Sequence, residues 1–215
     1  MRIASLSLLA LCLTLAAVPA MAQTFYSNGP TNGNTDAWTV NFGFVVSDTF
    51  RFYSPGTTIT GVDFAAWMTP GDVLVNAEVS LTSSENGGTS FFDQTVAFTQ
   101  SGCVSNQYGY DVCNENGTLP GGGVNLGSMG IIWINISNAS SAAGDPVYWD
   151  ENSGPSGASE NSVGTIPSES FTVLGTSSST TTSTTTTGTT PEPSSIMLFG
   201  SGILGLAGML RRKLF

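Results

Sequence analysis

Residues 23–175 form short runs in which apolar and polar positions alternate, and clusters of Gly, Pro, Asn and Ser separate these runs. The clearest run covers residues 72–81, where most second positions are apolar. A period of two indicates a half-buried antiparallel strand. We therefore expect one face of this strand to carry Val73, Val75, Ala77, Val79 and Leu81.

Further runs rich in Val, Ile, Thr and aromatic residues predict more strands, and no helical period continues beyond one turn. The runs are 38–46, 50–53, 59–68, 90–98, 109–113, 130–136, 147–149 and 169–174. With about nine strands and no helix to cover a sheet, two packed antiparallel sheets are the stable arrangement. We predict an all-β fold for residues 23–175, an antiparallel β-sandwich of jelly-roll type; a closed barrel is the alternative.

The first 22 residues have the pattern of a secretory signal peptide. Arg2 precedes an apolar run over residues 6–18, and Ala20, Met21 and Ala22 form a small-x-small cleavage site. We expect signal peptidase to remove residues 1–22; an uncleaved anchor is the alternative. The apolar run is short for a permanent membrane span.

The other end of the chain changes composition twice. Residues 176–190 are almost entirely Ser and Thr and cannot bury a core, so they predict a disordered, solvated stalk. Residues 196–210 are apolar and predict a short transmembrane helix of about 22 Å at about 1.5 Å per residue. The basic cluster Arg211, Arg212 and Lys213 should stay cytoplasmic, which places the preceding domain outside.

Between the stalk and the apolar helix stands the triplet Pro191, Glu192 and Pro193. The triplet, the short apolar helix and the basic end together resemble the PEP-CTERM sorting signal of Gram-negative bacteria, here over residues 191–215. The resemblance implies processing by exosortase near the triplet. It also implies an inner-membrane intermediate that faces the periplasm, followed by delivery to the cell envelope, cell surface or extracellular polysaccharide.

Charge and cysteine content narrow the functions of the domain. The net charge is −10, and Arg51 is the only basic residue between residues 23 and 190, which excludes nucleic-acid binding through a basic patch. Cys103 and Cys113 form a pair in an exported chain, so we expect a disulfide bond. A metal site is the rival interpretation, but the chain has no histidine to complete it.

The missing residue types also limit catalysis. Without histidine there is no Ser-His-Asp triad, and without lysine in the domain there is no Ser-Lys dyad. Glycoside hydrolysis by a carboxylate pair remains open, with Asp145, Asp150 and Glu151 as candidates. We nevertheless predict that the protein is not an enzyme and has no catalytic residues.

The segment with the strongest functional appearance places aromatic, acidic and amide side chains in succession: Tyr148, Trp149, Asp150, Glu151 and Asn152. One interpretation is a strand and turn whose aromatic residues fill the core. The other is a sugar- or cation-binding loop with a stacking ring and oxygen ligands. No calcium-loop motif is present, so we predict no cofactor and keep calcium as a hypothesis.

These observations favour an exported structural or adhesive protein of the envelope or matrix. The alternative is a carbohydrate- or calcium-binding module, and a carboxylate-pair glycoside hydrolase is a more distant one. Exosortase and signal peptidase are the expected processing partners, and an extracellular polysaccharide is a further candidate.

Overall fold

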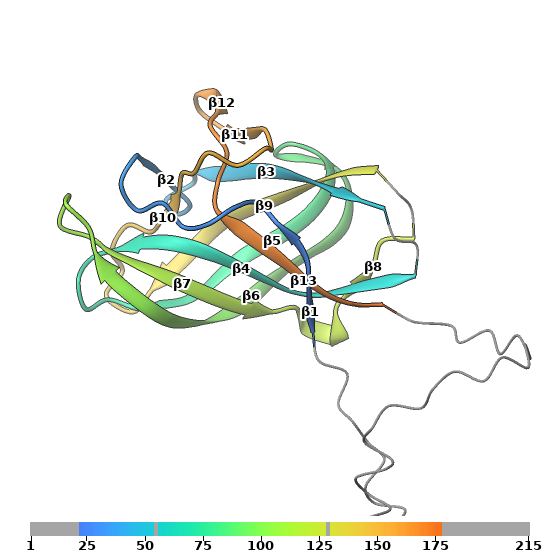
Figure 1. The fold of residues 1–215 in the computed structure, drawn as a ribbon, viewed down its shortest axis with the longest axis horizontal. Helices are drawn as coiled ribbons and strands as arrows, with labels where there is room; N and C mark the ends of the chain where they lie inside the picture. The colour runs from blue at the N-terminus through green and yellow to red at the C-terminus, as the bar shows by residue number, and fades with distance from the viewer. Residues whose placement is uncertain (1–21, 54–55, 128–129, 178–215) are drawn as a thin grey trace, which may run out of the picture. The chain divides into compact units, whose positions relative to one another are not determined.

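The computed structural model describes residues 22–53, 56–127 and 130–177 (Figure 1). The regular secondary structure of the described residues is almost entirely β-strand, with one short 3-10 helix, η1 (Pro120–Gly122). The strands are β1 (Gln23–Ser27), β2 (Ala37–Thr39), β3 (Val45–Phe52), β4 (Thr57–Met68), β5 (Leu74–Ser84), β6 (Gly87–Ser105), β7 (Asp111–Thr118), β8 (Val124–Asn125), β9 (Gly130–Ser141), β10 (Tyr148–Asp150), β11 (Ala158–Glu160), β12 (Gly164–Ile166) and β13 (Phe171–Ser177).

All pairings between these strands are antiparallel, and they form two sheets joined by β6. One sheet has the order β1-β13-β4-β7-β6, and the other has the order β6-β5-β9-β3-β11-β12. The first part of β6 pairs with β5 up to Ala97, and the second part pairs with β7 from Phe98 onward. The strand therefore passes from one sheet to the other. The predicted all-β, antiparallel, sandwich-like fold is confirmed.

One continuous apolar core fills the space between the sheets. Its side chains come from both sheets and alternate along their strands, as expected where one face of a sheet is buried. The largest fully buried apolar members are Trp149, Phe50, Phe52, Ile59, Met68, Leu74, Leu81, Leu119, Ile134 and Ile136. Burial of each such side chain contributes about 1.5–3 kcal/mol, which makes this core the main source of stability.

The predicted strand at residues 72–81 exists as β5, but its facing is only partly right. Ala77, Val79 and Leu81 are buried as predicted, whereas Val73 and Val75 are 45% and 46% exposed. The pairing of β5 with β9 shifts register on both sides of Asn76. Such bulges reverse which side chains face the core, so the prediction was wrong for Val73 and Val75.

The single strand predicted at residues 38–46 is divided into β2 and the start of β3. Phe42 and Gly43 adopt φ values of 56° and 92°, and the Phe44 amide donates a hydrogen bond of 3.1 Å to the Asn41 carbonyl. This tight turn ends β2. Positive φ is tolerated by glycine and is uncommon for a bulky residue, so the apolar composition of the run concealed the turn.

The last strand extends slightly into the predicted stalk, because Thr176 and Ser177 of β13 pair with Thr58 and Thr57 of β4. The remainder of the stalk, the sorting triplet, the helix 196–210 and the basic cluster lie outside the described residues, as do residues 1–21 of the predicted signal peptide. Within the described ranges, no helix has the length and apolarity needed to cross a membrane.

Candidate functional site

Strand β10 carries the first half of the segment predicted to bind a ligand, and it lies between β2 and β4. Tyr148 is half-buried, and its ring lies 5.5 Å from that of Tyr110 in an edge-on arrangement. Both rings pack against a small second cluster on the outer side of β4, formed by Ala65, Trp67 and Val112.

Trp149 points the other way and is completely buried. Its ring packs edge-on against Phe64 and Phe171, with both centroid distances at 5.8 Å. The indole N–H donates a hydrogen bond of 2.8 Å to the Ser170 carbonyl. Trp149 therefore fills the core, as the structural interpretation of this segment predicted, and its faces are not open to a sugar ring.

Asp150 is completely buried, and its carboxylate organises the loop after β1. It accepts hydrogen bonds of 2.7 Å from the backbone amides of Asn32 and Gly33 and from the indole N–H of Trp67. Three N–H donors satisfy a buried carboxylate without a metal ion or a basic side chain. The arrangement makes Asp150 an anchor for this loop.

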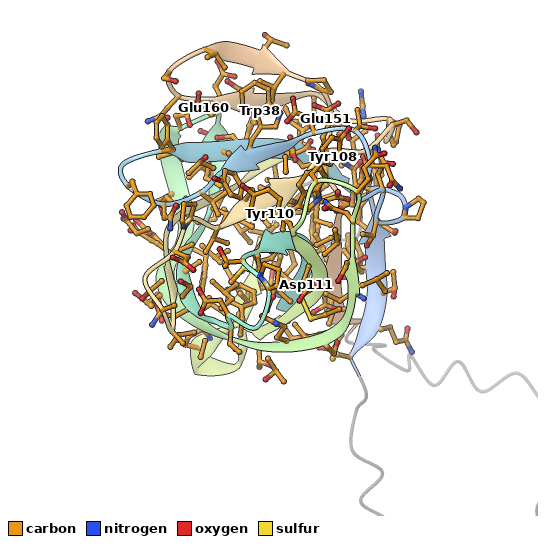
Figure 2. The ribbon with its side chains drawn as sticks, turned by 90° about the vertical axis from the view of Figure 1, so that its left-hand side faces the viewer. Trp38, Tyr108, Tyr110, Asp111, Glu151 and Glu160 are labelled. Carbon is orange, nitrogen blue, oxygen red and sulfur yellow. A yellow bond between two sulfur atoms is a disulfide. The ribbon has the colours of Figure 1, made fainter. Side chains whose placement is uncertain are left out.

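Glu151 and Asn152 are also largely buried. Glu151 accepts a hydrogen bond of 3.3 Å from the Trp38 indole, and the two side chains lie together in Figure 2. The Asn152 side chain donates to the Asn28 carbonyl at 2.8 Å and accepts from the Gly154 amide at 2.9 Å. Asn152 also lines a surface cleft of about 490 Å³ with the loop after β1.

Two further acidic residues, which the sequence analysis did not select, lie beside this segment. Asp48 of β3 is fully buried and accepts hydrogen bonds from the Asn28 side chain at 3.2 Å and from the Glu169 amide at 2.7 Å. Burial raises the pKa of Asp48 to about 6, although its hydrogen bonds act in the opposite direction. Asp48 falls between the predicted strands 38–46 and 50–53, so no sequence signal marked it.

Glu169 is fully buried, and neither carboxylate oxygen has a hydrogen-bond partner among the described residues. Its backbone pairs with Glu151 through a single antiparallel bridge. Burial, followed by the nearby charges of Asp48, Glu151 and Asp150, raises the pKa of Glu169 well above its usual range. Such an environment favours the neutral, protonated form of a carboxyl over the charged form.

The acidic residues do not form a metal centre in the part of the chain that the structure describes, where no group of three or more Cys, Asp or Glu side chains could hold an ion. The calcium hypothesis stays a prediction, because calcium also takes oxygen ligands from Asn side chains and backbone carbonyls. Asp150 is engaged by three donors, and Glu151 is nearly buried. The absence of a cofactor and the absence of an enzymatic activity both remain predictions.

The predicted disulfide bond between Cys103 and Cys113 is present and joins β6 to β7 across a separation of 10 residues. Cys113 is buried at 1% exposure, whereas Cys103 lies at the surface. The bond closes the hairpin whose tip carries Tyr108, and the Tyr108 ring stacks on Trp67 at 5.5 Å. Figure 2 shows Tyr108 and Tyr110 on this side of the domain.

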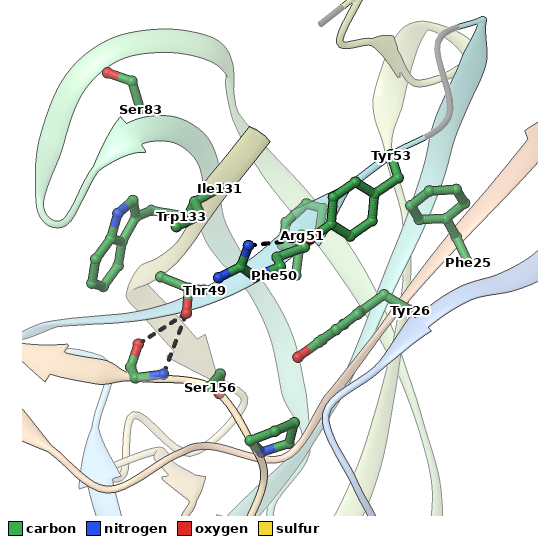
Figure 3. Close-up of a pocket in the computed structure, with 12 residues that line it drawn as sticks. Phe25, Tyr26, Thr49, Phe50, Arg51, Tyr53, Ser83, Ile131, Trp133 and Ser156 are labelled. Carbon is green, nitrogen blue, oxygen red and sulfur yellow. Dashed lines mark hydrogen bonds between the residues drawn. The ribbon is translucent and has the colours of Figure 1, made fainter. Parts of the chain in front are cut away.

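A hollow of a different kind lies elsewhere, on β3, β9 and β1 (Figure 3). We call it the aromatic groove. It has a volume of about 890 Å³. Its lining residues are Phe25, Tyr26, Thr49, Phe50, Arg51, Tyr53, Ser83, Ile131, Trp133, Pro155, Ser156 and Gly157. No predicted site residue belongs to it, because its members come from five separate parts of the chain.

Sequence comparison defines the class of the protein through its C-terminal region. The family model of the PEP-CTERM protein-sorting motif matches residues 189–213, close to the predicted signal at residues 191–215. The chain therefore carries a PEP-CTERM sorting signal, and it is an exported protein that exosortase sorts and that passes through the membrane to the cell envelope. A comparison with curated proteins found no match to the chain.

Proposed function

We propose that this protein is a structural or adhesive component of the cell envelope or extracellular matrix. The sorting motif at residues 189–213 carries this proposal, since it directs the domain toward the cell surface. The domain itself supports a non-enzymatic role. Asp150, one of the candidate catalytic carboxylates, is occupied in holding a loop through three N–H donors.

The proposed route has three steps. Signal peptidase removes residues 1–22 after export. The apolar helix 196–210 then holds an inner-membrane intermediate whose β domain faces the periplasm, with the basic cluster Arg211, Arg212 and Lys213 on the cytoplasmic side. Exosortase finally processes the chain near Pro191, Glu192 and Pro193 and releases the domain to the envelope or matrix.

Intact mass and cell fractionation in the native host test this route. The wild-type protein is expected to lack the residues beyond the triplet and to leave the inner membrane. The double variant Pro191→Ala/Pro193→Ala is expected to keep its tail and to remain in the inner membrane. Ser183→Ala, in the predicted stalk, is the control and should behave as wild type. A wild-type protein that retains residues 211–215 would make the tail a plain membrane anchor instead.

A carbohydrate-binding role is the second candidate, and the aromatic groove favours it. Flat aromatic rings and hydroxyl groups that line an open hollow are suited to a sugar, whose ring has apolar C–H faces and polar edges. Sugar binding would also explain how an adhesive domain is retained in a polysaccharide matrix.

A further inference from the structure

The aromatic groove is built on outward-facing residues of two paired strands. In the antiparallel register of β3 and β9, Thr49 lies opposite Trp133 and Arg51 lies opposite Ile131. Tyr53 follows two residues after Arg51 and is 57% exposed. Figure 3 shows Arg51 between Trp133 on one side and Tyr53 on the other. The strand geometry thus places a guanidinium group between two aromatic rings.

The remaining walls are held in place by packing. The ring of Phe25 lies 5.0 Å from the buried ring of Phe52, and that of Tyr26 lies 5.8 Å from Phe50. On the opposite side, Thr49 both donates to and accepts from the backbone of Gly157 at 3.3 Å. Because these contacts fix both walls, little ordering should be needed when a ligand enters.

Arg51 gives the groove its electrostatic character. It is the only basic residue between residues 23 and 190, and the groove lining contains no acidic residue. Among the described residues, its guanidinium makes one hydrogen bond, of 3.1 Å, to the Tyr53 hydroxyl. Most of its five N–H donors therefore remain for a ligand, and their planar fork suits a carboxylate. The rest of the domain carries acidic residues and no basic residue, so its surface would repel an anion.

We propose that the aromatic groove binds a carboxylated polysaccharide, a saccharide chain that contains uronic acid units. One carboxylate pairs with Arg51, sugar rings stack on Trp133 and Tyr53, and the Ser83 hydroxyl donates to a sugar edge. The volume of about 890 Å³ accommodates a few sugar units. This inference rests on the proposed adhesive role and names its ligand class.

Calorimetric titration of the mature protein, purified from its host, tests this assignment with two probes. These are a hexamer of galacturonate and the neutral hexamer cellohexaose. The galacturonate hexamer is expected to bind at one site per chain, about tenfold or more tightly than cellohexaose, because the charge-assisted bonds to Arg51 are available to it alone. Higher ionic strength should lower the affinity for the galacturonate hexamer and leave the affinity for cellohexaose unchanged.

Substitutions in the groove separate charge from stacking. Arg51→Gln should lower the affinity for the galacturonate hexamer about tenfold and leave the affinity for cellohexaose unchanged. Arg51→Lys should keep part of the preference for the galacturonate hexamer. Trp133→Ala should lower the affinity for both hexamers. Phe42→Ala is the matched control, since Phe42 is an aromatic residue with 66% exposure that does not line the groove. Thermal unfolding establishes that each variant is folded.

Equal affinity for the two hexamers, no binding of either, or full affinity after Arg51→Gln would each overturn the assignment. Adhesion of the mature protein to isolated matrix of its host is measured alongside. If the protein adheres to the matrix but does not bind the galacturonate hexamer, the adhesive role stands and the carboxylated ligand is wrong. If the protein neither adheres to the matrix nor binds the galacturonate hexamer, both proposals fail.

Discussion

Asp48, Glu115 and Glu169 are acidic side chains that lie fully buried in the β domain. Burial raises the pKa of Asp48 to about 6, raises that of Glu115 to about 7, and raises that of Glu169 well above its usual range. An acid whose pKa is raised on folding contributes its full stability below its unfolded pKa, and this contribution is lost as the pH rises through the folded pKa. These residues therefore make the domain lose stability as the pH rises from about 4.3 toward 7.

Glu169→Gln tests this effect where the carboxyl has no hydrogen-bond partner among the described residues. The amide keeps the shape of the side chain and cannot become charged, so the variant should be more stable than wild type at pH 8 and similar at pH 4.5. Urea unfolding across this pH range measures the difference. Glu85→Gln, in an exposed turn, is the control and should leave the pH profile unchanged. An equal loss of stability at both pH values would contradict the prediction.

Single residues also show where sequence reasoning stops. The predicted strand at residues 147–149 is present, shifted by one residue, as β10 (Tyr148–Asp150). The aromatic filling of the core was one of the two interpretations of this segment. The partners of Asp150 could not be predicted, because Asn32, Gly33 and Trp67 reach it from other parts of the fold. Glu169 was concealed for the same reason, since its burial depends on neighbouring strands.

At the level of elements, alternation predicted which segments become strands better than it predicted their facing. In β5 a register shift on each side of Asn76 exposed Val73 and Val75, and a tight turn at Phe42 divided a predicted strand. Bulges and turns of this kind depend on how neighbouring strands pair, which a single-strand pattern does not contain. The number of strands and their order in the sheets also depend on how neighbouring strands pair, so a single-strand pattern does not contain them either.

The hairpin of β6 and β7 allows a prediction about the disulfide bond. The bond between Cys103 and Cys113 closes a loop with a separation of 10 residues. Loop-closure entropy then favours the oxidised protein by about 2–3 kcal/mol. Urea unfolding with and without a reducing agent should show this difference, and the double variant Cys103→Ala/Cys113→Ala should not respond to the reducing agent. A reduced wild-type protein of unchanged stability would refute the estimate.

For the whole molecule, sequence reasoning was strongest at the C-terminus. A sorting signal is recognised by the order of its parts along the chain, so Pro191, Glu192, Pro193 and the basic cluster could be found without a fold. The aromatic groove is the opposite case. Its rings and Arg51 come together only through the pairing of β3 with β9 and the packing of β1, so no local motif announces it.

The basic cluster gives a prediction about the whole exported protein. Arg211, Arg212 and Lys213 should hold the end of the chain on the cytoplasmic side during sorting, because basic residues flanking an apolar helix resist translocation. Replacing all three with Gln should let the tail slip through the membrane, so that unprocessed protein accumulates in the periplasm. Fractionation followed by intact mass detects this species.

The matched control for that experiment keeps the charge and changes only the side chain. Arg211→Lys/Arg212→Lys retains three positive charges beside the apolar segment and should sort as wild type, since the positive-inside rule depends on Lys and Arg alike. Normal sorting of the triple Gln variant would show that charge is not what retains the tail. Failure of the Lys variant alone would instead indicate that exosortase, or another processing partner, recognises the arginine side chains themselves.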